Sequence, residues 1–572
     1  MKSMSPEQTA AASTRELSAD RASYELRLNR LELPVHIGCD AAERASVQLV
    51  AVSVRVRLPV APLGCRSDRL EDTLALDVLA ERLRDAAAQP CALIEHLAQR
   101  MYVAARAACP ADVALELELT KLAPPIAGLA GGMSFRVDAP AAPGDASATL
   151  LEQTDPNVYA AIRGEERRQA DSVELIPSEN YTYPEVLAAL GSVLTDKYAE
   201  GYPGRRYYGG NTFSDRIEEL ARERARQLFR AEHANVQPLS GSPMNQAAYL
   251  ACLDPGDTIL AMDLSHGGHL THGAPVSHMG RIFRFVRYRT RAEDGAIDYD
   301  DLLRLAREAR PKLVLCGYTS YPRDYDYAAF RRIADSCGAL LMADVSHVGG
   351  LIAGGALDNP FDHGADLVTT TTHKTLRGPR AGLILCRSEH ARKIDRSVFP
   401  GLQGGPHMNT IAAVAVALGL AQQPEFAAYA RRVLDNARAL ASALLARGAR
   451  LVTGGTQNHL MVLDTIESFG VDGARAEATL ERAGITCNKQ IIPDDPRPPL
   501  QPSGIRLGTP AITTRGMGTE EMSALAEWLV QALQHPDDPT QLNVIRTRCA
   551  ELCRRYPIPG AALRSVGGTL RA

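Results

Sequence analysis

Hydrophobic and polar positions follow two different patterns in the first quarter of the chain. Residues 46–60 and 113–122 place apolar, often β-branched side chains at every second position, which predicts strands. Residues 79–89 and 91–109 repeat apolar positions at helical spacing. Together these segments predict a small α+β unit over residues 24–137, with helices on one face of an antiparallel sheet.

A third pattern begins after residue 150. Short runs that are apolar throughout predict strands buried on both faces, as in a parallel sheet, and amphipathic helices separate them. From about residue 423 long helices lead into a smaller mixed domain. The predicted strands are residues 257–264, 311–318, 339–348 and 381–386, and the predicted helices include 214–230, 327–338 and 425–448.

The segment 138–150 separates these patterns, because it is rich in Ala, Pro, Gly and Ser and is typical of a linker. The first 23 residues contain acids and no apolar run, which predicts a disordered tail rather than an export signal. We therefore expect five parts: a tail (1–23), an α+β domain (24–137), a linker (138–150), a large α/β domain (151–422) and a C-terminal small domain (423–572).

Composition narrows the class of protein. The 572 residues carry a formal net charge of −4, which gives no indication of a nucleic-acid partner or of an anionic membrane surface. No run of about 18 apolar residues occurs, so no membrane-spanning helix is predicted. The eleven cysteines lack paired zinc spacing, and we interpret them as reduced thiols with no metal site. We expect a cytoplasmic protein.

Lysine is scarce, with seven lysines among 63 basic residues. Arginine can replace lysine as a positive charge, but not as a neutral amine that attacks a carbonyl. Lys374 stands among threonines and a glycine turn, just before an apolar run. Taken alone it is more simply a surface lysine, and its neighbours along the chain decide between the two interpretations.

Enzymes that use pyridoxal phosphate (PLP) need a lysine, a carboxylate for the pyridine nitrogen, phosphate donors, a group against the ring and a cation for the substrate carboxylate. Asp344 and His347 follow a buried strand, although an aspartate there could also cap a helix. Ser240, Gly241 and Ser242 precede a helix, where backbone N–H groups bind phosphate or, more simply, are capped.

Six segments resemble serine hydroxymethyltransferase, a fold-type I PLP enzyme. The resemblance extends from about residue 151 to residue 558. It implies a PLP-binding large domain, a small α+β domain, and reversible transfer of a one-carbon unit between serine and tetrahydrofolate, which yields glycine and 5,10-methylenetetrahydrofolate. The segments are 174–192, 196–211, 265–273, 369–380, 399–409 and 502–516.

The resemblance also implies the role of each site residue. Lys374 would form the Schiff base with PLP, and Asp344 would pair with the pyridine nitrogen. His269 would stack on the ring face, and His347 would touch the ring hydroxyl region. Glu200 and Tyr208 would handle protons. The implied PLP-binding residues are Ser240, Gly241, Ser242, Thr319 and His373, with Tyr198, Gly404 and Gly405 from a partner subunit of a homodimer or larger homo-oligomer. The implied substrate-binding residues are Ser178, Tyr207, Leu264, Gly268, Leu270, Arg380, Gln490 and Arg506.

Four positions depart from the family pattern. Gln490 stands where an Asn is usual and keeps the amide, and Thr319 replaces a Ser but keeps the hydroxyl. Asn409 and Val414 replace a His and a Lys, and the sequence offers no physical account of either change. Gln490 and the altered segment after Pro406 favour one alternative, a folate-independent PLP aldolase or transaldolase that acts on a β-hydroxy amino acid. A further alternative from another class is a non-catalytic folate-binding or assembly protein.

The segment 24–137 resembles dihydroneopterin aldolase. The resemblance implies a pterin site in which Glu95 anchors the ring, Lys121 is catalytic and Glu43 is a nearby acid. Leu76 stands where that family has a tyrosine, and Leu has no hydrogen-bonding group. We therefore predict that this unit keeps the fold and has little or no aldolase activity.

Overall fold

The structure is a computed structural model that describes residues 24–58, 65, 73–109, 113–126, 129, 131–139 and 151–560. The chain forms two compact units, which meet in sequence between Ile162 and Arg163. The predicted tail and residues 140–150 of the predicted linker lie outside the described residues. The predicted boundary near residue 423 stays a prediction, since it falls inside the second unit.

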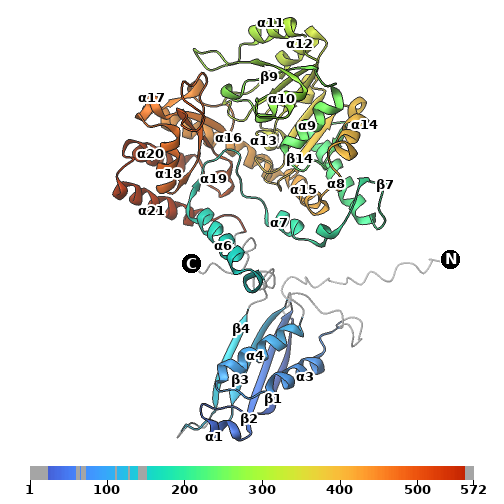
Figure 1. Cartoon of the computed structure of the whole chain (residues 1–572). Coiled ribbons are helices and arrows are strands. Elements are labelled where there is room, and N and C mark those ends of the chain that lie inside the picture. The colour runs from blue at the N-terminus through green and yellow to red at the C-terminus, as the bar shows by residue number, and fades with distance from the viewer. Residues whose placement is uncertain are drawn as a thin grey trace, which may run out of the picture. The chain divides into compact units, whose positions relative to one another are not determined.

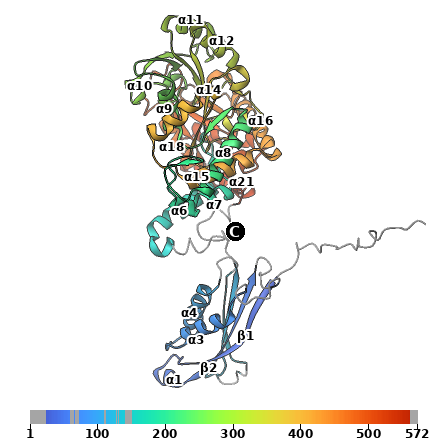
Figure 2. The ribbon, with the colours of Figure 1, turned by 90° about the vertical axis from the view of Figure 1, so that its right-hand side faces the viewer.

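The first unit is built on a four-stranded antiparallel sheet in the order β1-β2-β3-β4. Alternation in β2 turns Val50, Val52, Val54 and Val56 into the core, where the helices cover them. Figure 2 shows α3 and α4 on one side of this sheet, as predicted. The elements are β1 (Tyr24–Val35), α1 (Ala41–Ala45), β2 (Gln48–Leu58), α3 (Leu76–Ala87), α4 (Ile94–Ala107), β3 (Ala114–Lys121) and β4 (Met133–Ala139).

The second unit contains a seven-stranded sheet in the order β10-β9-β11-β12-β13-β14-β8. The strands β10 to β13 are parallel, whereas β14 is antiparallel to both of its neighbours. The strands are β8 (His233–Asn235), β9 (Thr258–Met262), β10 (Arg284–Tyr288), β11 (Leu313–Gly317), β12 (Leu340–Asp344), β13 (Leu367–Thr371) and β14 (Gly382–Cys386).

The sequence prediction that residues 381–386 form a parallel strand is therefore wrong. A strand buried on both faces is apolar throughout whichever way it runs, so hydrophobicity does not reveal its direction. The connection decides it: only residues 372–381 separate β13 from β14, whereas a parallel crossover needs about a dozen residues or more.

Helices cover both faces of this sheet (Figure 1). Alternate side chains of the strands pack in two clusters: Leu260 and Val314 lie against α8, α11, α12, α13, α15 and α16, and Ile259 and Leu313 lie against α9, α10 and α14. These helices are α8 (Thr212–Phe229), α9 (Gly241–Cys252), α10 (Met279–Ile282), α11 (Tyr299–Ala309), α12 (Tyr327–Cys337), α13 (Gly349–Ala353), α14 (Ser388–Arg396), α15 (Met408–Ala421) and α16 (Pro424–Leu445).

The C-terminal part has its own antiparallel sheet in the order β15-β16-β19-β18 and its own core. Its strands are β15 (Arg450–Leu451), β16 (Leu460–Asp464), β18 (Asn488–Gln490) and β19 (Gly504–Gly508), and its helices are α17 (Thr465–Phe469), α18 (Gly473–Arg482), α19 (Pro510–Thr514), α20 (Thr519–Gln534) and α21 (Pro539–Arg555).

The remaining elements of this part of the chain are small, and the first of them belong to an N-terminal arm, residues 156–206. Its short strand β5 pairs with β17 in parallel, so the arm is tied to the C-terminal part. The remaining elements are α6 (Pro156–Asp171), β5 (Val173–Glu174), α7 (Pro184–Leu190), η3 (Val193–Asp196), β6 (Gly201–Tyr202), β7 (Arg205–Arg206), η4 (Leu264–His266), η5 (Leu270–His272), η6 (Pro360–His363), η7 (Ser397–Leu402), η8 (Val452–Gly454) and β17 (Ile485–Thr486).

The structure gives a physical account of the two unusual residues of α15. The Asn409 amide donates to the backbone carbonyl of Leu190 at 2.9 Å, which satisfies the C-terminal end of α7. Val414 is fully buried in the core beneath the large sheet.

Among the described residues no single helix is long and apolar enough to cross a membrane; α15 and α16 reach that length only together, with a bend of 82° between them.

Candidate active site

A cavity of about 580 Å³ lies at the carboxyl ends of β9, β11, β12 and β13. Ligands of open α/β sheets bind at this edge. The cavity brings together sixteen of the predicted residues from segments far apart in sequence. They are Ser178, Ser240, Gly241, Ser242, Leu264, Gly268, His269, Leu270, Thr319, Asp344, His347, His373, Lys374, Arg380, Gln490 and Arg506.

Lys374 stands in the loop between β13 and β14, and its Nζ donates to the Thr371 hydroxyl at 2.8 Å. Burial lowers its pKa to about 8, because an ammonium loses hydration inside the protein. The charge of Asp344 opposes this shift, and the charges of Arg506 and Arg380 add to it. The amine is therefore far easier to deprotonate near neutral pH than an ordinary lysine.

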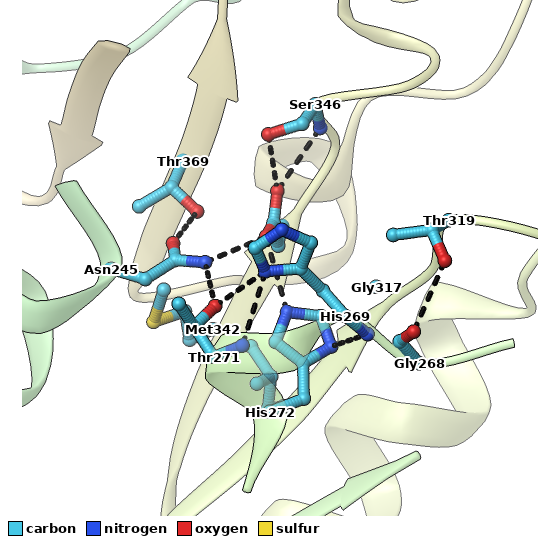
Figure 3. Close-up of polar contacts among 12 residues, drawn as sticks. Asn245, Gly268, His269, Thr271, His272, Gly317, Thr319, Met342, Ser346 and Thr369 are labelled. Atoms are coloured by element: carbon cyan, nitrogen blue, oxygen red, sulfur yellow. Dashed lines mark hydrogen bonds and ion pairs between the residues drawn. The ribbon is translucent and has the colours of Figure 1, made fainter. Parts of the chain in front are cut away.

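Asp344 ends β12 with both carboxylate oxygens held by donors. Figure 3 labels the residues that hold it, Asn245, His272 and Ser346. Oδ1 accepts from the Ser346 hydroxyl at 2.6 Å and from the Ser346 backbone N–H at 3.1 Å. Oδ2 lies 2.8 Å from the Asn245 amide and 3.1 Å from His272 Nε2. Burial raises its pKa, but the hydrogen bonds from His272 and Ser346 outweigh burial and hold the pKa well below its usual range. The site holds a buried carboxylate in its ionised form.

Two histidines that line the cavity are held neutral. Burial lowers the pKa of His269 to about 4, and the neighbouring His272 adds to the shift. Burial lowers the pKa of His373 to about 3, with the charge of Lys374 acting in the same direction. His269 Nδ1 lies 2.7 Å from the Thr271 hydroxyl, which fixes the ring (Figure 3). Neutral imidazoles of this kind can pack against a ligand ring.

The first turn of α9 forms an anion cradle on one side of the cavity. Ser240 is the N-cap residue, and its side chain makes no cap hydrogen bond. Gly241 allows close approach, since a Cβ there would lie 2.9 Å from Thr371 Cγ2. Backbone N–H groups at a helix N-terminus, with the free hydroxyls of Ser240 and Ser242, are donors suited to phosphate. Thr319 donates to the Gly268 carbonyl at 3.1 Å instead.

Arg506 reaches the cavity from β19 of the C-terminal sheet. Its Nε donates to Asn488 Oδ1 at 3.2 Å and its Nη1 donates to the backbone carbonyl of Thr319. Burial lowers its pKa to about 10, yet within the described part of the chain no carboxylate lies within ion-pair distance of it. A buried guanidinium in this state suits a carboxylate ligand, which it can bind through two parallel hydrogen bonds.

Six predicted residues do not line this cavity and lie near one another elsewhere. A Cβ on Gly404 would lie 3.1 Å from Glu200 Oε1, and one on Gly405 would lie 3.2 Å from the Tyr198 ring. Tyr198 and Tyr208 form a tilted ring pair 4.9 Å apart. The side chains of Tyr198, Tyr207 and Tyr208 are 55%, 76% and 47% exposed. They are free to face a second molecule.

The site of the first unit is partly assembled. Lys121 is buried and forms an ion pair with Glu43, which also accepts from the Cys39 backbone N–H at 2.9 Å. The bond from Lys121, followed by that of Cys39, lowers the pKa of Glu43. Glu95 is exposed in the first turn of α4, and Leu76 begins α3 without any polar group to offer.

Sequence reasoning missed the residues that hold Asp344. Signals for them existed: Ser346 follows it by two residues, as in a local turn, His272 follows His269 by three, and Asn245 lies one helical turn after Gly241. Glu179, Tyr318 and Thr371 also line the cavity and were not predicted.

Comparison with known proteins decides the family. Residues 151–529 match the serine hydroxymethyltransferase family model. The serine hydroxymethyltransferases of Acidobacterium capsulatum, Synechococcus sp. and Rhodopirellula baltica are 53%, 55% and 49% identical to this chain over 416, 421 and 414 residues. The matches cover 72–73% of this chain and 97–98% of each relative. The chain belongs to the serine hydroxymethyltransferase family.

Membership confirms the predicted fold class, a fold-type I PLP-dependent transferase with a central α/β sheet. It also confirms that the chain is an enzyme of the PLP-dependent transferase class. Residues 26–138 match the dihydroneopterin aldolase family model, in agreement with the second resemblance. The relatives account for the second unit, and the first unit is an addition to it.

Proposed function

We propose that this chain transfers the hydroxymethyl carbon of serine to tetrahydrofolate, giving glycine and 5,10-methylenetetrahydrofolate, with PLP held in the cavity around Lys374. The observation that carries the proposal is the meeting, in one cavity, of a lysine with a pKa of about 8, an ionised buried carboxylate and a half-buried arginine that has no carboxylate partner among the described residues. Each of these charged groups is costly to bury. The lysine matches the aldehyde of PLP, the carboxylate matches its pyridine nitrogen, and the arginine matches the carboxylate of an amino acid.

The residues present fit PLP. Lys374 has the accessible amine for its aldehyde, Asp344 the carboxylate for its pyridine nitrogen, and the first turn of α9 the donors for its phosphate. Gly241 and Gly268 allow the cavity wall to pack closely, because a Cβ on Gly241 would lie 2.9 Å from Thr371 Cγ2 and one on Gly268 would lie 2.3 Å from the Met262 carbonyl. When bound, PLP supplies an aldehyde for amines and a ring that accepts electrons from the substrate α-carbon.

The protein groups would then divide the work. Arg506 binds the substrate carboxylate and thereby orients the amino acid. Asp344 holds a proton on the pyridine nitrogen, which keeps the ring electron-poor. The neutral rings of His269 and His347 exclude water without adding charge. Gln490 offers an amide to the folate, although its Nε2 also donates to the Ile491 carbonyl at 3.0 Å.

A homo-oligomer with shared sites would supply the missing proton-handling groups. Glu200 and Tyr208 do not line the cavity of their own chain, and the cluster that contains them is exposed. The proposal therefore places Tyr198, Glu200, Gly404 and Gly405 at a neighbouring subunit's cavity. This arrangement explains why tyrosines with such large exposed areas occur together.

For the first unit we propose weak pterin binding and slow aldolase turnover. The Glu43–Lys121 pair supports a retained pocket, because a buried lysine is seldom kept without a partner. Leu76 cannot transfer a proton, and the loss of one positioned proton-transfer group costs roughly 10²–10⁴ in rate.

The test of the main proposal uses Lys374→Arg and Lys312→Arg as a matched pair. Lys374→Arg keeps the charge but removes the amine, so it should lose the yellow absorbance of lysine-bound PLP and nearly all serine turnover. Lys312→Arg should behave as wild type, since Lys312 does not line the cavity. The proposed function requires that the wild-type chain form glycine from serine in a folate-dependent reaction. If the Lys374→Arg variant retains the absorbance of lysine-bound PLP, the assignment of Lys374 is refuted.

A further inference from the structure

His347 and His459 form a buried pair of imidazoles at the wall of the cavity. His347 Nδ1 lies 3.3 Å from His459 Nε2, and the rings stack with an interplanar angle of 27° and centroids 5.5 Å apart. Only His347 lines the cavity; His459 is fully buried behind it. The two rings come from different sheets, since His347 follows β12 of the large sheet and His459 directly precedes β16 of the C-terminal sheet.

Both rings are neutral. Burial lowers the pKa of His347 well below its usual value, and the charges of Lys374 and Arg506 add to the shift. Burial lowers the pKa of His459 to about 3, with the same two cations contributing. A neutral imidazole has one donor nitrogen and one acceptor nitrogen. One ring must therefore donate to the other, and the choice fixes both tautomers.

The surroundings of His459 decide the direction of this bond. Its Nδ1 is buried without a hydrogen-bond partner of good geometry among the described residues, and the group that acts on the ring from the backbone is the Pro177 carbonyl. A carbonyl oxygen can only accept, so it favours a proton on the nitrogen nearest to it and repels a lone pair. His459 is then protonated on Nδ1, its Nε2 is an acceptor, and His347 Nδ1 is the donor.

The position of His459 is itself fixed. Its backbone carbonyl accepts from the Thr509 N–H at 3.1 Å. The neighbouring Asn458 donates to the Tyr318 hydroxyl at 3.0 Å, and the Tyr318 ring stacks with His347 at a centroid distance of 6.5 Å and an interplanar angle of 30°. His347 therefore stacks with two rings, His459 and Tyr318, that are both anchored by the 458–459 segment.

We propose that His459 is a positioning residue that holds His347 in the Nδ1-protonated tautomer. The remaining nitrogen, Nε2, has no hydrogen-bond partner among the described residues and belongs to a side chain that lines the cavity. It is then a fixed acceptor, and the ligand group that it selects is a hydroxyl or N–H donor. This inference rests on the proposed binding of PLP, whose ring carries a hydroxyl.

Three substitutions of His459 separate hydrogen bonding from packing. His459→Gln can still place an amide oxygen near His347 Nδ1. His459→Phe keeps the volume and the stacked ring but leaves His347 Nδ1 without an acceptor, and His459→Leu does the same without an aromatic ring. Each full-length apoenzyme is titrated with PLP, and the dissociation constant is read from absorbance. Thermal unfolding of each apoenzyme shows whether it is folded.

We expect His459→Phe and His459→Leu to weaken PLP binding by about tenfold or more, in the range of the cost of an unsatisfied buried donor, and His459→Gln to stay within a few-fold of wild type. An equal loss of PLP affinity in His459→Gln and His459→Phe, or an unchanged PLP affinity in His459→Phe, would overturn the inference. If the His459→Phe and His459→Leu variants do not fold, the His459→Gln variant decides the outcome, because the inference requires it to bind PLP nearly as tightly as the wild type.

A double-mutant cycle tests whether His459 acts through His347. In a His347→Ala background the further change His459→Phe should leave PLP affinity nearly unaltered, whereas an additive loss would show an independent structural role and refute the proposal. A wild-type chain that fails to bind PLP at all would instead refute the proposed function. The two failures are thus distinguishable.

Discussion

In the function proposed above Lys374 captures PLP, and the pKa of Lys374 determines the pH at which capture becomes fast. Only the neutral amine attacks a carbonyl, and burial lowers the pKa of Lys374 to about 8. At pH 7 about one amine in ten is then neutral, against about three in ten thousand for a lysine with the ordinary pKa. The buried lysine presents about 300 times more nucleophile at neutral pH.

The assay mixes apoenzyme with PLP at a series of pH values and follows the absorbance of lysine-bound PLP. Because the pKa of Lys374 is lowered, the neutral form predominates above about pH 8. The rate should rise with pH up to that point and then level off. Free PLP titrates too, so its reaction with a small soluble amine at each pH is the reference. An inflection near the ordinary lysine pKa would refute the reasoning.

Charge variants should move the inflection in opposite directions. The charge of Arg506 disfavours the ammonium form of Lys374, so Arg506→Gln should raise the inflection. The charge of Asp344 favours the ammonium form, so Asp344→Asn should lower it. An inflection that stays in place in both variants would show that burial alone, and not these charges, sets the pKa of Lys374.

Three further predictions concern substrate binding, assembly and the first unit. Arg506→Lys should weaken serine binding roughly tenfold or more and PLP binding much less, since charge-assisted hydrogen bonds are worth about 1.5–3 kcal/mol each; titrations with both ligands check this, and lost PLP with unaltered serine binding would contradict it. Mixed Lys374→Ala and Glu200→Gln subunits should regain part of the activity that each lacks alone, and no recovery despite proven subunit exchange would exclude shared sites. The full chain should cleave dihydroneopterin slowly or not at all, and a rate typical of an aldolase, abolished by Lys121→Ala, would reverse our interpretation of Leu76.

The sequence pointed to residues that meet in the cavity, but not to the residues that hold Asp344 in place. Lys374, Asp344 and Arg506 could be found because each is the residue type that a reaction step requires. Asn245 and His272 could not be found in this way, because they bind Asp344 rather than a ligand and many polar residues could do so. The predicted direction of β14 was wrong for a related reason. Hydrophobicity along the sequence indicates that a strand is buried, but it does not indicate which strand it pairs with or in which direction.

Lys374 and Arg506 stand on two different sheets, one in the loop between β13 and β14 and the other on β19. An amino acid that engages both acts as a removable cross-link between the large sheet and the C-terminal sheet. The link stabilises the joined form by an amount that grows with the logarithm of ligand concentration. Backbone amides around His459, where the C-terminal part contacts His347 and Pro322 of the large α/β part, should then exchange with deuterium more slowly as serine is added, although His459 does not line the cavity.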